Sequence, residues 1–536
     1  MADLVEQWWD DEAQDRTLGH RALMRLVVTA IALEITRPGE RARTRLRTAV
    51  ELAGRLDELQ GSDGLFSSDG NLHSPPDSAF TLNDVGIGLE LLPRVGAPER
   101  AAIEERLRSI AAAAAPALVA GGVHTPNHRW EISAALVRLR ELDEGAIARA
   151  EQWLAEAVDV DADGLYSERS ANYAAYVSNP CLLELAEVLG RDDLEEIVHR
   201  NLHAQLDLTD ADGVVETVFS RRQDQGRPIP IEAFHTQLRR FALRGCEICV
   251  RGAARTEPSV GALAAIALVE VAAEPALDAE LPPVPAPGRE PLRRHFAEVG
   301  LLVSESGSTR WVVYGGSDVP HVGRIGSGLA GNPTFLRYRS GAAVVRSLRL
   351  SREFFGLGPF RSEGLAVDDG VARLHESVSA RYYQPLSVER RRTGGDYGLV
   401  DDGRFSASMS FDERTSDEVR LTTDVTVRPI DDALEVAVDI AGPQVRWSLE
   451  IALGEGEISG VERVGETIYR MTGNRAELRN GSDAVVIETG LAPATNGFYA
   501  PGEAFTFLGG TDALDGPRIY LTGEAPSTWT LTLRPG

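Results

Sequence analysis

The sequence predicts a multidomain α+β protein, with helical hairpins over residues 1–280 and a mostly antiparallel β region over residues 295–536. Three observations predict this division. Apolar residues recur at three- and four-residue spacing throughout the first half. An Asp-Gly turn repeats between the helical segments. After about residue 295, alternating apolar segments between Gly and Asp turns replace the helical pattern.

The helical periodicity predicts helices that are rich in Leu and Ala, the residues with high helix propensity. The predicted helices span residues 18–36, 41–60, 99–119, 128–141, 144–158, 181–190 and 258–273.

The repeated turns give the first half its organisation. They contain Asp63-Gly64, Asp163-Gly164 and Asp212-Gly213, with a looser Gly121-Gly122 between the first two. Successive glycines are 58, 42 and 49 residues apart, which corresponds to about two helices per repeat. Such hairpins either stack into a solenoid or close into a ring, and in both cases equivalent loops gather on one rim.

Residues 281–294 are rich in Pro, which predicts a semi-rigid linker between the two parts. Beyond it, segments such as EVRLTTDVTVRP and TWTLTLRPG alternate apolar and polar residues, as strands with one buried face do. The second part is therefore predicted to be an antiparallel β-sandwich.

Composition excludes several classes of function. All 55 basic residues are Arg, so Walker A phosphate binding and Schiff-base chemistry lack their lysine. The net charge of −26 argues against nucleic-acid binding. No run of 18 apolar residues predicts a membrane span, and the acidic N-terminus lacks a signal-peptide pattern. We therefore expect a cytoplasmic protein.

Three short motifs fail in their context. The GxGxxG at Gly326–Gly331 precedes a strand-like segment, not a helix. The Asp-rich loop at 159–170 has Ser170 where a calcium loop needs Glu. Cys246-Glu-Ile-Cys249 has no second cysteine pair or matching His in the sequence pattern, so no metal site is predicted.

Polar clusters follow the repeated turns, and a shared rim would bring them together. They contain His124, Asn127, His128, Arg129 and Trp130; then Tyr166, Glu168, Arg169, Tyr173 and Tyr176; then Glu216, Arg221, Arg222, Gln223 and Arg227. These amides, imidazoles, phenols and guanidinium groups suit β-elimination from a uronic acid. In that reaction the carboxylate must be neutralised, a base removes the C5 proton, and an acid protonates the departing O4.

The Asn127-His128 pair, followed 45 or 48 residues after His128 by Tyr173 or Tyr176, resembles the catalytic set of the heparinase II/III-like polysaccharide lyases. The resemblance implies an (α/α) toroid followed by an antiparallel β-sandwich. It also implies that Asn127 and His128 neutralise the uronate carboxylate and that one of the two tyrosines acts as acid and base. The expected partner is an acidic polysaccharide or oligosaccharide, and the mechanism needs no cofactor.

The family usually adds a His or Tyr from the sandwich, and His321 is the candidate, with Tyr338 behind it. We expect further substrate contacts from side chains of two kinds. Arginine and amide groups would bind the sugar carboxylates, and an indole would stack on a sugar ring. These candidates are Trp130, Arg169, Arg221, Arg222 and Gln223.

Two other functions stay open. A glycosidase on the same type of toroid would need two carboxylates about 5–9.5 Å apart, and Asp84 with Glu131 or Glu168 could supply them. A glycan-binding protein without activity could also keep this fold.

Overall fold

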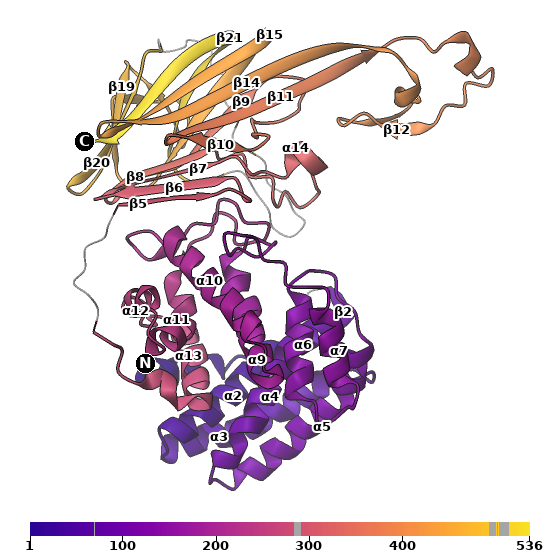
Figure 1. The fold of residues 1–536 in the computed structure, drawn as a ribbon, viewed down its shortest axis with the longest axis vertical. Helices are drawn as coiled ribbons and strands as arrows, with labels where there is room; N and C mark the ends of the chain where they lie inside the picture. The colour runs from indigo at the N-terminus through magenta and orange to yellow at the C-terminus, as the bar shows by residue number, and fades with distance from the viewer. Residues whose placement is uncertain (69, 284–290, 492–499, 501, 503–513) are drawn as a thin grey trace. The chain divides into compact units, whose positions relative to one another are not determined.

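The computed structural model describes residues 1–68, 70–283, 291–491, 500, 502 and 514–536 (Figure 1). The chain divides into two compact units. The helical unit comprises Met1–Glu216 and Pro228–Pro287, and the sheet unit comprises Thr217–Arg227 and Gly288–Gly536. The segment Thr217–Arg227 therefore groups with the sheet unit, although the sequence pattern assigned it to the helical part. Part of the predicted linker, residues 284–290, lies outside the described residues.

The helices of the two units are α1 (Ala2–Glu12), α2 (His20–Thr36), α3 (Glu40–Leu59), α4 (Pro75–Leu91), α5 (Glu99–Ala120), α6 (His128–Arg138), α7 (Ala146–Leu154), α8 (Ala171–Tyr173), α9 (Asn179–Leu189), α10 (Asp192–Leu208), α11 (His235–Leu243), α12 (Glu247–Ala253), α13 (Gly261–Ala273) and α14 (Val319–Val322). Short strands β1 (Phe66–Ser68), β2 (Asn71–Ser74), β3 (Val214–Val215) and β4 (Ile229–Pro230) lie in loops of the helical unit.

The sequence analysis predicted no helix over the ranges of α1, α4, α10, α11 and α12. Of these, α4 begins with two prolines. Ser74 caps this helix by accepting a hydrogen bond of 3.1 Å from the Asp77 backbone N–H, and Pro75 occupies its first turn, where proline is favoured. Gly86 lets α4 approach α6 closely, because a Cβ at this position would lie 2.8 Å from the Arg138 Cβ. The two prolines therefore lie at the start of a helix.

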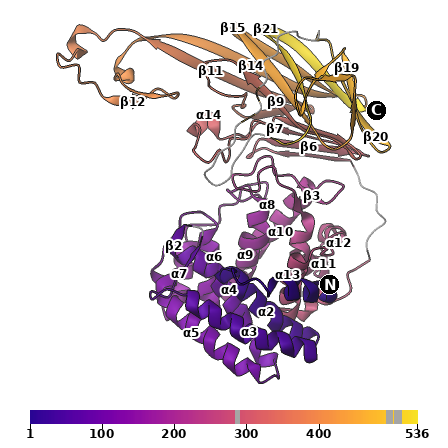
Figure 2. The same ribbon diagram turned by 180° about the vertical axis from the view of Figure 1, so that it is seen from behind.

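The helices close into a ring, which follows from their contacts, and Figures 1 and 2 show this unit from two opposite sides. Helix α2 packs on α4, α4 on α6, and α6 on α9, while α3, α5 and α7 cover them. Helix α13, near the end of the unit, packs against α1 and α2 at its beginning. The sequence left a solenoid or a ring open, and the structure is the ring.

The three Asp-Gly turns have one conformation. Gly64, Gly164 and Gly213 have φ of +82°, +89° and +81°, a region that favours glycine. In each turn, the glycine N–H bonds to the carbonyl three residues earlier, at 2.9–3.2 Å. The Gly121-Gly122 loop has no glycine with positive φ, so it is a different kind of turn.

The sheet unit contains one branched sheet, antiparallel among the described residues except where β18 pairs with β21. Its strands are β5 (Leu292–Phe296), β6 (Leu301–Ser306), β7 (Thr309–Tyr314), β8 (Leu336–Ser340), β9 (Ala343–Arg352), β10 (Leu365–Asp368), β11 (Val371–Tyr383), β14 (Ser416–Ile430), β15 (Ala433–Leu453), β16 (Glu457–Ser459), β17 (Val461–Arg463), β18 (Ile468–Met471), β19 (Arg475–Asn480), β20 (Asp483–Thr489) and β21 (Arg518–Pro535). A separate hairpin is formed by β12 (Leu399–Asp401) and β13 (Ser406–Ser408).

Strand β15 explains why the sheet folds into a sandwich. Its first half pairs with β14 and its second half with β9 along the same edge, while β21 follows both halves. Buried residues from both halves of β15 form one hydrophobic cluster with those of its partner strands, including Val425 of β14 and Leu350 of β9. The predicted fold class, a helical toroid followed by an antiparallel β-sandwich, is confirmed. None of the helices in the described ranges is long and apolar enough to cross a membrane.

Candidate functional site

Asn127 and His128 begin helix α6, at the end of the loop that starts with Gly121-Gly122. Asn127 is the N-cap residue and His128 the first residue of the helix. Their exposed fractions are 2% and 7%. The His124 ring meets the His128 ring edge-on, with centroids 4.7 Å apart. The positive end of the helix dipole favours an anion at this position, which suits residues that would receive a carboxylate.

The loop after the second Asp-Gly turn meets this helix start. The Asn127 side-chain amide donates a hydrogen bond to the carboxylate of Glu168, which is almost fully buried. Arg169 follows with φ +53°, a left-handed conformation that is unusual for a residue with a side chain. Ser170 then caps α8 by accepting a 3.1 Å hydrogen bond from the Tyr173 N–H. Two consecutive polar clusters are therefore in direct contact, as the repeat predicted.

The two candidate tyrosines stand in different local structure. Tyr173 ends α8, and Tyr176 lies in the π-helical turn η2 (Ala174–Ser178) that follows directly. Such π-turns often mark functional sites. Both side chains are half-buried. Burial, together with the nearby Glu232 carboxylate, raises the pKa of Tyr176 to about 12, which makes its phenolate hard to form and Tyr176 a poor base.

Arg21 of α2 joins this group, although no sequence pattern singled it out. Its guanidinium lies 3.9 Å from the centre of the Phe80 ring, and Phe80 in turn meets His128 edge-on at 6.1 Å. The Arg21 side chain is 45% exposed and forms an ion pair with Asp77. The Phe80 ring thus contacts both the Arg21 guanidinium and the His128 imidazole. Only folding brings α2, α4 and α6 together, so spacing along the chain carries no signal for it.

The cluster of Arg221, Arg222 and Gln223 belongs to the sheet unit. Arg221 donates two hydrogen bonds to Asp318, at 2.7 and 2.8 Å, and so already holds a carboxylate of its own chain. Arg222 and Gln223 are half-buried in the same segment. His321, on α14 of the same unit, is exposed. The structure thus groups these four candidates with the sheet unit, whereas His128 belongs to the helical unit.

Two predicted substrate contacts are buried in cores. Trp130 has an exposed fraction of 0%, and the Arg129 guanidinium covers its ring at 4.5 Å, so it has no free face for a sugar. Tyr338 is 2% exposed within the hydrophobic cluster of the sheet unit, where burial raises its pKa to about 12. The stacking role for Trp130 and the supporting role for Tyr338 are therefore corrected to packing roles. Trp130 lies on the buried face of α6 and Tyr338 on the buried face of β8. The assignment from motifs did not take this periodicity into account.

The carboxylates of the hydrolase alternative are mostly enclosed. Asp84 is buried and pairs with Arg25 at 3.1 Å. Glu131 is buried too, and it accepts hydrogen bonds from Asn83, at 2.7 Å, and from the Cys181 thiol, at 3.2 Å. Burial raises the pKa of Glu131 to about 7. Of these carboxylates, Glu168 is the one that contacts the Asn127 group.

Metal ligands do gather elsewhere in the helical unit. Within the described ranges, one group of His and Cys side chains has the spacing that a metal needs, and it comprises His199, His203, Cys246 and Cys249. The sequence analysis found no His to match the CxxC motif, because both histidines lie on α10, more than 40 residues earlier. The calcium-like loop is engaged otherwise: Asp159 pairs with Arg129 at 3.0 Å.

No family model and no curated protein matches this chain. Solved structures resemble it in fold. The heparinase III crystal structure matches with a TM-score of 0.56 and 12% identity, covering 96% of this chain and 77% of that chain. A mutant of the heparan sulfate lyase HepC from Pedobacter heparinus has a TM-score of 0.49 and 14% identity, covering 98% of this chain and 78% of that one. The chondroitin AC lyase of Streptomyces coelicolor A3, in complex with chondroitin sulphate, has a TM-score of 0.45 and 15% identity, covering 96% and 82%. The likeness to heparinase III is one of fold, and it agrees with the fold class that the sequence predicts.

Proposed function

We propose that this protein is a polysaccharide lyase that cleaves uronic-acid-containing glycans by β-elimination. The observation that carries the proposal is the contact between two rim loops of a lyase-like toroid. The Asn127–Glu168 hydrogen bond holds the start of α6, with His128, against the loop that leads to Tyr173. An amide, an imidazole and a phenol from distant parts of the chain thereby lie on connected segments.

In the proposed reaction, Asn127 and His128 bind the uronate carboxylate and neutralise its negative charge. The C5 proton then becomes acidic enough to be removed, because the negative charge developing on the carboxylate is stabilised by hydrogen bonds and by the N-terminal end of α6. Electrons from the C5–H bond form the C4=C5 double bond. The C4–O4 bond breaks, and O4 leaves with a proton.

Tyr173 is the proposed proton-transfer residue. Tyr176 is the weaker candidate for a base, since its pKa lies near 12 and the ionised form is costly at neutral pH. Tyr173 is half-buried and directly follows the loop that contacts Asn127. A single tyrosine can remove the C5 proton and then deliver a proton to O4, which needs no metal or organic cofactor.

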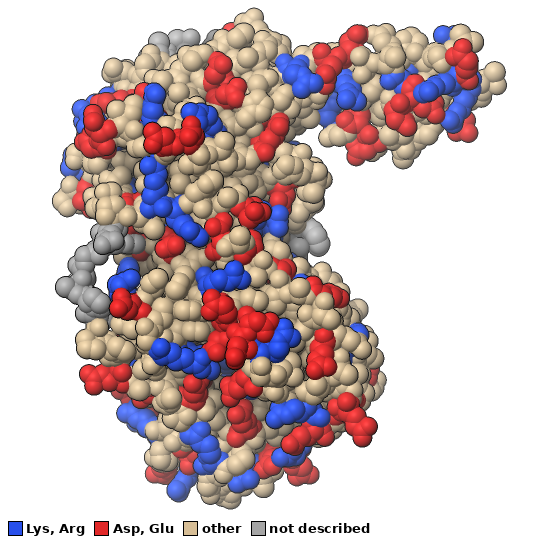
Figure 3. All heavy atoms as spheres, in the orientation of Figure 1, with Lys and Arg blue, Asp and Glu red and all other residues tan. Residues whose placement is uncertain are grey.

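Arg21 is the proposed cation for an acidic substrate. The chain carries a net charge of −26, so a polyanion needs a local positive group to approach it. On the face of the helical unit in Figure 3, acidic and basic side chains are intermixed, and local arginines there offset the acidic surface. Arg21 is half-exposed and packs on the Phe80 ring, which in turn contacts His128, so it is the cation proposed to meet this need.

A paired substitution tests the assignment. Tyr173→Phe should reduce turnover on a uronic-acid glycan by about 10²–10⁴-fold, the usual contribution of a general acid or base. Tyr176→Phe is the matched control, three residues away and equally half-buried, and it should cost less than about tenfold. Retained turnover in Tyr173→Phe would remove Tyr173 from the mechanism.

A further inference from the structure

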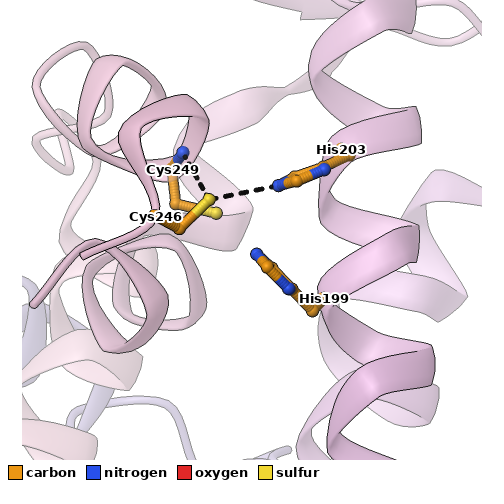
Figure 4. A group of neighbouring side chains, drawn as sticks. All are labelled: His199, His203, Cys246 and Cys249. Atoms are coloured by element: carbon orange, nitrogen blue, oxygen red, sulfur yellow. Dashed lines mark hydrogen bonds between the residues drawn. The ribbon is translucent and has the colours of Figure 1, made fainter. Parts of the chain in front are cut away.

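We infer that the helical unit holds a structural zinc ion between His199, His203, Cys246 and Cys249. The ligand atoms of these four side chains all lie within 4.8 Å of one another. Figure 4 shows both imidazoles directed from α10 toward the two cysteine sulfurs. The inference is independent of the proposed lyase activity.

Each helix supplies its ligands at a spacing that suits one metal. His199 and His203 are four residues apart on α10, so they project from the same face of the helix. Cys246 is the N-cap residue of α12, and its sulfur accepts a hydrogen bond from the Cys249 N–H at 3.5 Å. This turn brings both sulfurs to one side, as in other CxxC metal sites.

The distances require little movement to bind zinc. The Nε2 atom of His203 lies 3.2 Å from the Cys246 sulfur. Zn–S bonds of about 2.3 Å and Zn–N bonds of about 2.0 Å place tetrahedral ligand atoms about 3.3–3.8 Å apart. The group as it stands spans at most 4.8 Å, so shifts of about 1 Å complete the tetrahedron.

His199 is already oriented for a metal. Its Nε2 atom is buried and has no hydrogen-bond partner within the described part of the chain. Its Nδ1 atom lies 3.9 Å from the Glu196 carboxylate, and the ring stacks on Phe241 at 4.5 Å. Ligating histidines usually donate their other ring N–H to a carboxylate, and Glu196 stands at an ion-pair distance, from which a shift of about 1 Å would form that hydrogen bond.

The donor set favours zinc and a structural role. Two thiolates and two imidazoles are the ligands of closed, four-coordinate zinc sites, and they leave no position for a substrate. The bound metal would join α10 to α12 across 43 residues of sequence. It would thus hold two helices of the ring together.

The test is zinc content in the full chain, produced without a polyhistidine tag and measured by mass spectrometry after dialysis. Wild type should contain one zinc per chain, and Cys246→Ser and His203→Ala should each lose it. Cys181→Ala and His73→Ala are the matched controls and should keep the full content, since neither residue belongs to the group. Replacing zinc with Co²⁺ should give thiolate charge-transfer and tetrahedral d–d absorption in wild type but not in Cys246→Ser.

Chelation gives a second measurement that does not depend on a variant that folds. Removing zinc from wild type should lower the melting temperature by about 8–16 °C, the shift expected when a ligand present at a thousandfold excess over its Kd is lost. Zinc alone should restore it. A Cys246–Cys249 disulfide in freshly purified protein, or zinc-free wild type that gives no cobalt spectrum, would overturn the inference. So would equal zinc content in Cys246→Ser and wild type.

Discussion

The side-chain amide of Asn127 donates a hydrogen bond to the carboxylate of Glu168, 41 residues further along the chain. This contact ties the first turn of α6 to the loop that precedes α8. In the proposed mechanism the same Asn127 amide also binds the carboxylate of the substrate. One N–H of the Asn127 amide is therefore engaged within the chain, and in the proposed mechanism the other N–H meets the substrate carboxylate.

Replacing Asn127 tests whether this amide serves catalysis. Asn127→Ala should lower kcat by about 10²–10³-fold, because a hydrogen-bond donor to the developing negative charge is lost. Asn127→Asp should be worse, since it places a second carboxylate against Glu168 and one of the two must take up a proton. Steady-state kinetics and the melting temperature of both variants would be compared.

The double variant Asn127→Asp with Glu168→Gln separates structure from chemistry. It removes the like-charge contact, so its melting temperature should return toward that of wild type. Its activity should stay low, because the amide now stands on the wrong loop. Recovery of full activity would show that Asn127 serves only to join the two loops.

Arg21 should contribute to substrate binding. Arg21→Gln should raise KM on an acidic glycan by about 10–100-fold, the worth of hydrogen bonds to a charged group, with a smaller change in kcat. Arg37→Gln is the control, because Arg37 is similarly exposed at 49% and also forms ion pairs, with Asp3 and Glu6. Equal kinetics for the two variants would exclude Arg21 from the binding site.

Glu131 should make stability depend on pH. Its pKa rises from 4.5 in a free side chain to about 7 in the folded chain, chiefly through burial. The folded state therefore holds a proton that the unfolded state has released, and stability is lost as pH rises from about 4.5 to 7. The difference amounts to about 3 kcal/mol at pH 8.

The variant Glu131→Gln stays neutral at every pH and should lack this loss. The melting temperature of Glu131→Gln minus that of wild type should be larger at pH 8 than at pH 5. Glu151→Gln replaces an exposed carboxyl group and should follow wild type at both values. A constant offset between Glu131→Gln and wild type across this range would contradict the raised pKa.

The repeated turns allow a matched test of packing. Gly64 and Gly213 have nearly equal φ, +82° and +81°. A Cβ on Gly64 would lie 2.0 Å from the Ala113 carbonyl oxygen, whereas a Cβ on Gly213 would have its nearest neighbour at 3.6 Å. Gly213→Ala should cost about 1–2 kcal/mol for backbone strain alone. Gly64→Ala should exceed about 3 kcal/mol, measured as a clearly larger fall in melting temperature. Equal falls would contradict the packing at Gly64.

The fold was largely predictable because its signals are local. Helix and strand periodicity and the Asp-Gly turns repeat within short windows of sequence. Helices α1, α4, α10, α11 and α12 were not predicted, and in α4 two prolines follow the Ser74 cap at the helix start. The sequence could not decide between a ring and a solenoid, because closure depends on α13 meeting α1 and α2 across the whole unit.

The site was predictable only in part. Asn127 and Glu168 each follow one of two successive turns of the repeat, Gly121-Gly122 and Asp163-Gly164. The repeat therefore indicated that their loops could meet. Arg21 carries no such signal, because its place beside His128 depends on packing through Phe80. The two histidines opposite Cys246 and Cys249 were missed for the same reason. Trp130 was misassigned, since a ring in a polar motif can still point into the core.

The central claim is elimination, and ultraviolet absorbance tests it most directly. The full chain would be incubated with a panel of uronic-acid polymers and their oligosaccharides, with Tyr173→Phe in parallel. The account predicts a rise from the conjugated C4=C5 uronate with wild type on at least one substrate, and a rise at least about 10²-fold slower with Tyr173→Phe. A flat trace accompanied by new reducing ends would show hydrolysis and contradict the account.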